Sequence, residues 1–460
     1  MSDPTAGYDV VILGGGSGGY ACALRAAELG LSVAMIEKDK VGGTCLHRGC
    51  IPTKALLHAG EVADATREAE QFGVRASLGG VDMKGVNAYK DAVVARLYKG
   101  LTGLVKSRHI TVVEGSGRLV APDAVEVDGQ RYTARRAVVL ATGSYSKTLP
   151  GLDVDGERVI TSEHALELDH VPASAVVLGG GVIGCEFASA WKSFGVDVTI
   201  VEALPRLLAV EDEQCSKAVE RAFRRRGIAF KVGKPFEKVE RTDAGVRVTV
   251  QGGDSFEAEL LLVAVGRGPT TADLGYEEQG ITMDRGWVIT DERLRTSVPN
   301  VYAVGDIVPG LQLAHRGFQQ GIFIAEEIAG QQPPVIDENG IPRVTYCDPE
   351  VASMGLTEAR AREVHGDVET ITYDLAGNGK SQILKTSGFV KLVRAKDGPV
   401  VGIHMVGARV SELIGEAQLI YNWEAYPSDV AQLVHMHPTQ SEALGEAHLA
   451  LAGKPLHVHG

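Results

Sequence analysis

The chain has 460 residues with a formal net charge of −13, and 44% of its side chains are hydrophobic. That length suits about three domains of ordinary size, and the acidic balance argues against a nucleic-acid partner, because binding to a phosphate backbone needs a basic face. Residues 1–7 carry neither the basic nor the apolar part of a signal peptide, and apolar runs such as residues 260–265 are too short to cross a bilayer, so we expect a cytoplasmic protein without a membrane partner.

The first predicted elements form a strand–helix–strand unit. Residues 9–13 are typical of a buried parallel strand, residues 14–19 (Gly-Gly-Gly-Ser-Gly-Gly) satisfy the pattern G-x-G-x-x-G, residues 20–29 are helical, and a strand over residues 32–36 ends in Glu37. Such glycines let the backbone approach a pyrophosphate at the helix N-terminus, and the acid can hold a ribose hydroxyl. The residues predicted to bind a dinucleotide here are Gly14, Gly16, Gly19 and Glu37.

Residues 42–54 then place Cys45 and Cys50 five positions apart. A disulfide between them would close a very small loop and constrain the unfolded chain little, so its predicted use is redox exchange rather than bracing the fold. Pro52 fits the first turn of a helix, which would put Cys50 near a helix N-terminus, where a thiolate is favoured. The other cysteines are expected to be structural or incidental thiols: Cys22, Cys185, Cys215 and Cys347.

The strand–helix–strand unit occurs a second time. Residues 175–178 lead into residues 179–184 (Gly-Gly-Gly-Val-Ile-Gly), a helix over residues 185–194 follows, and a strand over residues 198–201 ends at Glu202. From the first glycine to the acid is 23 positions in each copy, from 14 to 37 and from 179 to 202. Two copies with this spacing favour two dinucleotide sites, and the alternative is a pair of tight strand–helix turns without a ligand.

Two dinucleotide sites beside a disulfide imply two cofactors. Thiolates exchange two electrons and nicotinamide exchanges a hydride, whereas a flavin does both, so we expect FAD and NAD. Glu202 can bond a ribose 2′-hydroxyl and repels a 2′-phosphate, which favours NAD over NADP; Arg206 is discounted because Pro205 turns the chain first. Asp306, at a third strand end, is predicted to bond the ribityl chain of the flavin or to cap the following helix.

The C-terminal region is rich in histidine. Dithiol oxidation needs a proton acceptor near neutral pH, which a histidine can provide; the alternative is a histidine-rich surface tract. The histidines concerned are His435, His437, His448, His457 and His459. Apolar residues recur at helical spacing over residues 413–423, which predicts a face buried either at a subunit interface or within its own domain.

The chain resembles the flavin-dependent pyridine nucleotide-disulfide oxidoreductases over essentially its whole length. The motifs that carry the resemblance are residues 14–19, 42–54, 141–143, 179–186, 266–267, 296–306, 313–315 and 435–442. It implies an α/β fold with two Rossmann-like dinucleotide-binding domains, for FAD and NAD, and an α+β C-terminal dimerisation domain. The implied division is 1–150 (FAD domain, first segment), 151–271 (NAD domain), 272–343 (FAD domain, second and central segment) and 344–460 (interface domain).

The resemblance also implies roles for single residues. Cys45 would attack the substrate, and Cys50 would face the flavin. Lys54 would lie near flavin N5, paired with Glu186. The further FAD-binding residues implied are Gly43, Thr44, Lys54, Ala141, Thr142, Gly143, Asp306, Leu313, Ala314 and His315. The NAD-binding residues implied are Gly179, Gly181, Ile183, Gly184, Glu186, Glu202 and Gly266, and no metal site is expected.

Within the family, the resemblance is greatest to members that oxidise dihydrolipoyl groups. It implies oxidation of the protein-bound dihydrolipoyl groups of 2-oxoacid dehydrogenase complexes or of the glycine cleavage system, with NAD+ reduced to NADH. His437, held by Glu442, would be the acid/base and would serve the other subunit of a homodimer. The implied partner is a lipoyl-bearing acyltransferase or a lipoyl carrier protein, and residues 401–460, with two basic and six acidic side chains, would offer it an acidic face.

Two alternatives stay open. One is a related reductase of the glutathione, mycothione or mercuric type, which Glu202 and a C-terminal tail without cysteine disfavour. The other is a flavoprotein subunit whose main role is to bind an assembly. One departure bears on this choice: His47-Arg48 stands where the family commonly has Asn-Val, and a cation there would favour thiolates and shift the redox potential.

Overall fold

The structure is a computed structural model that describes residues 7–457, and it divides into two compact units. The first unit consists of the residues up to 56, 84–147 and 266–338. The second consists of 57–83, 148–265 and the residues from 339 onward. The expected breaks near 150 and 271 lie close to unit borders, but the second unit combines the expected NAD and interface domains, and the four-domain division stays a prediction.

A parallel sheet with the strand order β3–β2–β1–β6–β19 forms the centre of the first unit. The strands are β1 Tyr8–Leu13, β2 Val33–Glu37, β3 Thr111–Glu114, β6 Gln130–Leu140 and β19 Val301–Ala303. The first residues of β6 pair antiparallel with β5 (Ala124–Val127), which pairs with β4 (Gly117–Ala121). The expected α/β architecture of the N-terminal region is therefore confirmed.

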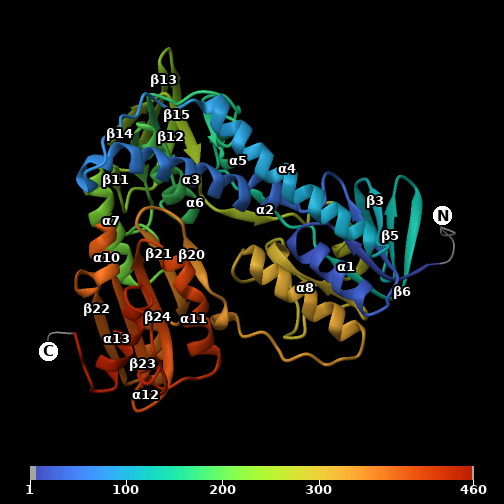
Figure 1. The fold of residues 1–460 in the computed structure, drawn as a ribbon. Helices are drawn as coiled ribbons and strands as arrows, with labels where there is room; N and C mark the ends of the chain where they lie inside the picture. Colours follow the sequence, from blue (N-terminus) through green and yellow to red (C-terminus); the bar gives the residue numbers. More distant parts are fainter. Residues whose placement is uncertain (1–6, 458–460) are drawn as a thin grey trace. The chain divides into compact units, whose positions relative to one another are not determined.

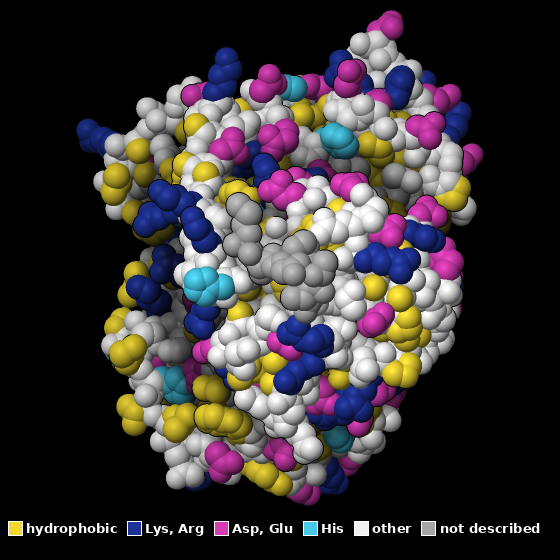
Figure 2. Space-filling model, turned by 90° about the vertical axis from the view of Figure 1, so that its right-hand side faces the viewer, with side chains coloured by type: hydrophobic (Ala, Val, Ile, Leu, Met, Phe, Trp, Pro, Cys, Tyr) yellow, Lys and Arg dark blue, Asp and Glu magenta, His cyan; other side chains and the backbone are white. Residues whose placement is uncertain are grey.

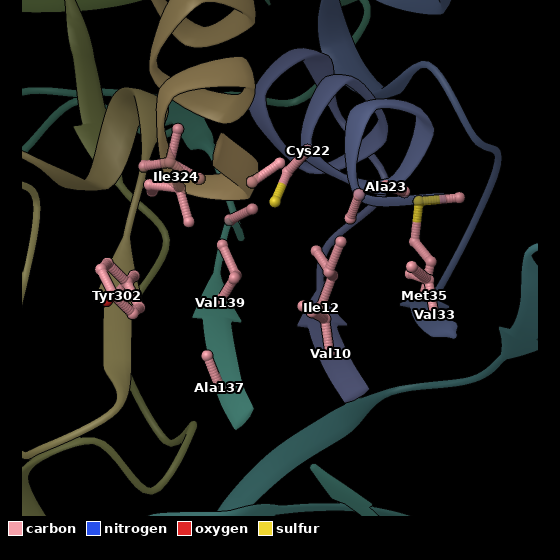
Figure 3. Packing of buried hydrophobic residues seen from close by; sticks show 14 of the residues in the cluster. Val10, Ile12, Cys22, Ala23, Val33, Met35, Ala137, Val139, Tyr302 and Ile324 are labelled. Atoms are coloured by element: carbon pink, nitrogen blue, oxygen red, sulfur yellow. The ribbon is translucent and has the colours of Figure 1, made fainter. Parts of the chain in front are cut away.

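Two helices, α1 (Ser17–Glu28) and α8 (Ala314–Ile328), lie side by side (Figure 1). Glycine allows this close approach, since a Cβ on Gly321 would lie 2.3 Å from the carbonyl oxygen of Gly18. Figure 3 shows the core beneath them, where Cys22 of α1 and Ile324 of α8 meet side chains such as Ile12 of the sheet. The opposite face of the sheet is buried as well, in a second cluster that includes Val11, Ala34 and Val138. Because both faces are covered, the strands consist of nearly continuous apolar residues.

The cysteine segment forms two consecutive helices. They are α2 (Gly43–Arg48) and α3 (Cys50–Arg67), followed by the long helix α4 (Met83–Ser107). The smaller elements of the first unit are β7 (Ser144–Ser146) with β16 (Arg267–Pro269), β17 (Met283–Asp284) with β18 (Trp287–Val288), and the 3-10 turn η3 (Gly305–Ile307).

The second unit contains another parallel sheet, in the order β11–β10–β9–β15–β8. Its strands are β8 Val159–Thr161, β9 Ser174–Leu178, β10 Asp197–Val201, β11 Ala229–Lys231 and β15 Leu260–Val263. The helices beside it are α5 (Ser162–Ala165), α6 (Val182–Phe194) and α7 (Glu213–Arg226). A separate antiparallel sheet is formed by β12 (Phe236–Thr242), β13 (Gly245–Val250) and β14 (Ser255–Ala258).

The C-terminal part of the second unit is a five-stranded antiparallel sheet, in the order β20–β21–β24–β23–β22. Its strands are β20 Arg343–Thr345, β21 Glu350–Gly355, β22 Val368–Asp374, β23 Phe389–Ala395 and β24 Val400–Gly407. Its helices are α9 Glu358–His365, α10 Gly379–Leu384, α11 Val410–Asn422, α12 Pro427–Val430 and α13 Glu442–Leu451. This sheet with its helices confirms the expected α+β class of the C-terminal domain.

Figure 2 shows acidic and basic side chains interspersed over the face turned to the viewer. That face therefore presents no continuous basic surface of described residues to a phosphate backbone. None of the helices within residues 7–457 is both long enough and apolar enough to span a membrane.

Candidate functional site

The first glycine-rich turn is shaped by contacts that only glycine allows. Gly14 has φ 110°, and a Cβ there would lie 2.2 Å from the carbonyl oxygen of Ala141; a Cβ on Gly19 would lie 1.8 Å from that of Gly14. The middle glycine differs, because a Cβ on Gly16 would meet no described atom within 4 Å. Gly16 is also the N-cap of α1 and provides no side-chain cap, so the first N–H groups of the helix are available to an anion.

The second turn repeats this geometry. Gly179 has φ 113° and a Cβ there would lie 2.3 Å from the carbonyl oxygen of Ala264, while a Cβ on Gly184 would lie 1.9 Å from that of Gly179. Gly181 again faces open space and is the N-cap of α6 without a side-chain cap. Both turns therefore fit the pyrophosphate of a dinucleotide, and Ile183 is part of the second one.

Two carboxylates at strand ends are held in the same way. Glu37 accepts hydrogen bonds from the N–H of Gly15 at 2.7 Å and of Asp39 at 2.9 Å. Glu202 accepts hydrogen bonds from the N–H of Gly180 at 2.5 Å and of Leu204 at 2.7 Å. Backbone groups thus fix each carboxylate beside its glycine turn, where a ribose would lie.

A cavity of about 430 Å³ opens beside Glu37 in the first unit. Its lining is mixed, with carboxylates and apolar side chains, as suits the adenosine end of a dinucleotide bound at the first turn. The lining residues include Glu37, Asp39, Val41, Tyr98, Thr102 and Glu114.

The two cysteines lie on separate helices next to this turn. The Gly42 N–H donates to the carbonyl oxygen of Gly15 at 2.8 Å, and a Cβ on Gly43 would lie 2.8 Å from Cα of Gly16, so the start of α2 packs directly on the glycine turn. Cys45 lies on α2. The helix breaks at Gly49, and α3 begins at Cys50, in agreement with the predicted helix N-terminus.

The side chains of Cys45 and Cys50 interact with each other. The hydrogen bond with Cys50 raises the pKa of the Cys45 thiol, burial adds to this effect, and the charge of Lys54 and a contact with Ser17 oppose it. Lys54 is thereby brought within electrostatic reach of the dithiol. Thr44, between Gly43 and Cys45, belongs to the same helix α2.

Tyr20 is a neighbour of the dithiol that sequence reasoning missed. Burial raises the pKa of its phenol to about 12, and the charges of Cys45 and Cys50 act in the same direction. Its ring lies 5.5 Å from that of Phe318 on α8. The only sequence signal was its position directly after the glycine turn.

His47 and Arg48 are engaged by groups other than the thiols. His47 Nε2 lies 3.0 Å from the carbonyl oxygen of Val41, and its ring packs edge-on to Tyr98 at 4.9 Å. Arg48 forms an ion pair with Asp39. This ion pair weakens the effect expected of a cation between the cysteines, which was to favour thiolates and to shift the redox potential.

Asp306 lies in η3 and accepts a hydrogen bond from Ser144 Oγ at 2.5 Å, while Arg267 Nε donates to the same hydroxyl at 2.7 Å. The alternative that Asp306 caps the next helix is wrong, because α8 begins at Ala314 with Leu313 as N-cap. The remaining expected FAD residues follow β6 or begin α8: Ala141, Thr142, Gly143, Leu313, Ala314 and His315.

Glu186 lies on α6 and is 3% exposed, and it accepts a hydrogen bond from the N–H of Tyr346 at 3.0 Å. Lys54 belongs to the first unit and Glu186 to the second, so their pairing stays a prediction. Gly266 likewise belongs to the first unit, whereas the other expected NAD residues belong to the second.

His437 and Glu442 are brought together as expected. His437 Nδ1 lies 2.9 Å from Glu442 Oε1, and Glu442 also accepts the N–H of Thr439 at 2.7 Å. Burial opposes ionisation of Glu442, but the Thr439 N–H and His437 outweigh it and lower the pKa of this carboxyl. Since the His437 side chain is 79% exposed, its second nitrogen is accessible to a reacting thiol.

The other histidines do not form a uniform surface tract. His435 lies 2.7 Å from Glu416, and that hydrogen bond raises the pKa of the imidazole. His448 is buried, and burial lowers its pKa to about 4. His457 bonds Glu446, and His459 lies outside the described residues.

The apolar stripe of α11 splits into two parts. Ala417 and Ile420 are buried in the core of their own domain, and Leu413 and Ile414 pack against it. Other apolar side chains of this region are exposed, Val434 by 98%; they are Leu419, Trp423, Tyr426, Leu433, Val434 and Met436. An exposed apolar surface therefore lies next to His437 in the chain.

The four other cysteines are buried, and burial raises the pKa of each thiol, as suits structural residues: Cys22, Cys185, Cys215 and Cys347. Within residues 7–457 no cluster of side chains is suited to hold a metal ion.

Comparison with known proteins gives two family matches. Residues 8–321 match the model of the pyridine nucleotide-disulphide oxidoreductases, and residues 341–448 match the dimerisation domain of the same family.

Relatives match over nearly the full length. A dihydrolipoyl dehydrogenase of Bacillus subtilis is 40% identical, covering 98% of this chain and 99% of the relative. The crystal structure of LpdA from Mycobacterium tuberculosis superposes with a TM-score of 0.90 at 29% identity, covering 96% of this chain and 99% of LpdA. The flavoprotein disulfide reductase RclA of Escherichia coli superposes with a TM-score of 0.87 at 26% identity, covering 97% and 99%.

Proposed function

The chain belongs to the pyridine nucleotide-disulphide oxidoreductase family, and from this premise we propose that it is a dihydrolipoyl dehydrogenase. It is a flavoprotein disulfide oxidoreductase, and its family uses FAD and a pyridine nucleotide. Two observations support the proposal of a dihydrolipoyl dehydrogenase. The helix that carries Cys45 packs against the first of two matching dinucleotide turns, with Cys50 at the start of the next helix. The chain is also 40% identical to a dihydrolipoyl dehydrogenase.

The thiol chemistry proposed for this chain starts from the oxidised pair. A thiolate of the dihydrolipoyl group attacks Sγ of Cys45, the Cys45–Cys50 bond breaks, and Cys50 leaves as a thiolate. The second lipoyl thiol then attacks the lipoyl sulfur of the mixed disulfide, which closes the lipoyl ring and releases Cys45. His437 accepts the proton of the first lipoyl thiol as the attacking thiolate forms, and Glu442 orients its imidazole. The proton of the second lipoyl thiol passes to the sulfur of Cys45 as it leaves.

The cofactors would be held by the two turns. FAD, when bound, would accept the electron pair of the dithiol and NAD+ would accept a hydride. The residues proposed to hold FAD are Gly14, Gly16, Gly19, Glu37, Gly43, Thr44, Lys54, Ala141, Thr142, Gly143, Asp306, Leu313, Ala314 and His315. Those proposed for NAD are Gly179, Gly181, Ile183, Gly184, Glu186, Glu202 and Gly266.

NAD is proposed over NADP on two grounds. The Glu202 carboxylate, fixed by two backbone N–H groups, would bond a ribose hydroxyl and repel a phosphate. Arg206 donates to the carbonyl oxygens of Ala209 at 2.8 Å and Glu211 at 3.3 Å, so its guanidinium is occupied within its own loop.

A homodimer is supported by the matched dimerisation domain and by the exposed apolar residues around Trp423 and Val434, which a second copy would cover. We propose that His437 serves the disulfide of the other subunit. The further partner proposed is a lipoyl-bearing acyltransferase or a lipoyl carrier protein, which would bind to the acidic C-terminal region. The proposed location of the enzyme is the cytoplasm. The four-domain division at 150, 271 and 343 is proposed with it.

The second candidate is another disulfide reductase of this fold. RclA, with a TM-score of 0.87, supports this candidate, as does the unusual pair His47-Arg48 between the cysteines.

The test is a set of specificity constants. Values of kcat/KM would be measured for lipoamide, glutathione disulfide and mycothiol disulfide, each with NADH and NADPH. The proposal expects lipoamide with NADH to exceed every other pair by at least about tenfold, a difference of 1.4 kcal/mol in transition-state binding. A higher value for another disulfide would favour the second candidate, and a folded, FAD-loaded protein without disulfide reduction would favour a structural subunit.

A further inference from the structure

The loop that joins β10 to α7, residues 202–212, is fixed at both ends. Near its start, Glu202 accepts the Gly180 N–H, and the Leu208 N–H donates to the carbonyl oxygen of Gly180 at 2.8 Å. At its end, Glu211 and Asp212 are only 3% and 2% exposed. The loop therefore connects the second dinucleotide turn to a buried region of the same unit.

That buried region is a network of ion pairs with the C-terminal sheet. Lys391 on β23 is 5% exposed, and its Nζ lies 2.9 Å from Asp212 Oδ1 and 2.8 Å from Glu358 Oε2. Arg343 on β20 places Nε 3.3 Å from Glu211 Oε1. A buried charge without its partner is strongly disfavoured, so these pairs hold the end of the loop in one position.

Arg206 is held within its own loop by two hydrogen bonds, but one of its N–H groups has no partner among the described residues. Its Nη2 donates to the carbonyl oxygens of Ala209 and Glu211, but its Nε is buried without a hydrogen-bond partner among the described residues. Leaving a guanidinium N–H unsatisfied is costly. Because both acceptor carbonyls belong to residues 209 and 211 of this loop, a loop without its ion pairs would no longer present them in this arrangement.

We propose that the ion pairs Asp212–Lys391 and Glu211–Arg343 set the cofactor specificity, by holding Arg206 away from the ribose beside Glu202. A guanidinium is the side chain best suited to bind a phosphate, and Arg206 lies only four positions after Glu202. Released, it would attract a 2′-phosphate. Asp212, Lys391, Glu211 and Arg343 are thus positioning residues. This inference rests on the proposed preference for NAD.

The experiment measures binding of two redox-inert fragments, 5′-AMP and 2′,5′-ADP, to the FAD-loaded enzyme by calorimetry. The wild type should prefer 5′-AMP. The double variant Asp212→Asn/Lys391→Met removes both charges, and asparagine keeps a cap for α7. It should shift the ratio of the two dissociation constants toward 2′,5′-ADP by about tenfold, the scale of coupling within one salt-bridge network.

Two further variants make the test specific. Adding Arg206→Met to the double variant should abolish the shift, because the phosphate then finds no guanidinium. Lys396→Met is the matched control, since this lysine pairs with Asp367 at 3.1 Å on the surface, and it should leave the ratio unchanged. FAD content and melting temperature show that each variant is folded.

Three results would overturn the inference. The ratio of the two dissociation constants could stay unchanged in a folded double variant, or its shift could persist after Arg206→Met is added. Arg206→Met alone, in the otherwise wild-type chain, could also change the ratio by more than about twofold, although the held guanidinium should not contribute to it. The measurement on Arg206→Met alone can be made even if the double variant fails to fold. In that case Glu211→Gln/Arg343→Gln replaces the double variant, because it removes the other ion pair of the loop. A wild type that binds 2′,5′-ADP as well as 5′-AMP would contradict the NAD preference itself.

Discussion

The carboxylates of Glu37 and Glu202 allow a prediction in which a substitution at one dinucleotide turn is the control for the same substitution at the other. Glu37 and Glu202 each accept two backbone N–H groups. Glutamine at either position can accept only one of them through its oxygen, and its NH2 group would face the other N–H. The variant also lacks the charge, so the hydrogen bond that a ribose hydroxyl would donate to this side chain is no longer charge-assisted; hydrogen bonds to charged groups contribute about 1.5–3 kcal/mol.

Because both side chains are partly exposed, we take the lower end of that range, which corresponds to about tenfold in affinity. Glu202→Gln should weaken binding of 5′-AMP about tenfold and leave FAD content unchanged. Glu37→Gln should weaken FAD retention during dilution by a similar factor and leave 5′-AMP binding unchanged in the fraction that keeps FAD.

The assay is flavin release followed by fluorescence, together with calorimetry of 5′-AMP. The reasoning would be refuted if Glu202→Gln released FAD, or if Glu37→Gln changed 5′-AMP binding in FAD-loaded protein. Either result would mean that the two turns do not serve separate dinucleotides. Equal losses of both ligands with a lowered melting temperature would indicate a general folding defect in that variant.

Other predictions concern the dithiol and the histidines. Cys50→Ser should abolish the long-wavelength charge-transfer absorbance of the reduced enzyme while Cys45→Ser keeps it without lipoamide activity; lipoamide turnover in both variants would contradict the assignment. His437→Ala should slow the dihydrolipoamide half-reaction by roughly 10²–10⁴-fold and spare reduction by NADH, and mixing it with Cys45→Ser under proven subunit exchange should restore part of the activity. Burial lowers the pKa of His448 to about 4, so below the ordinary value near 6.5 the unfolded chain binds a proton that the folded chain does not. The free energy of unfolding should therefore fall by about 3 kcal/mol from pH 7 to pH 4, and denaturation of His448→Gln should show a shallower fall; an equal slope would exclude this cause.

The sequence predicts those parts of the site whose residue types are dictated by backbone geometry. Gly14 and Gly179 have positive φ and touch a neighbouring strand end, so no other residue fits and the pattern is visible without a structure. The helix starts were predicted three residues late, at 20 and 185, whereas α1 begins at Ser17 and α6 at Val182. Their N-caps are glycines, which carry no capping side chain to mark the start.

What remained hidden depends on contacts between distant residues. Lys391 and Asp212 are 179 positions apart in the sequence, so no local pattern predicts that they form an ion pair. The approach of Tyr20 to the cysteines depends on how α2 packs on the glycine turn. The apolar stripe of α11 had two possible meanings, and only the structure shows that Ala417 faces its own core while Trp423 is exposed.

Strand β6 pairs antiparallel with β5 and parallel with β1, and this has a consequence for the order of folding. Its first half pairs with β5 across a two-residue turn, with Val127 opposite Gln130, whereas its second half pairs Val138 with Val11 of β1, far away in the chain. Closing the short turn costs little chain entropy, so we expect the β4–β5–β6 meander to form first and to present a pre-aligned edge to β1. In pulse-labelled hydrogen exchange during refolding, amides of residues 124–133 should gain protection before those of residues 8–13, and the opposite order would show that the long-range pairing leads.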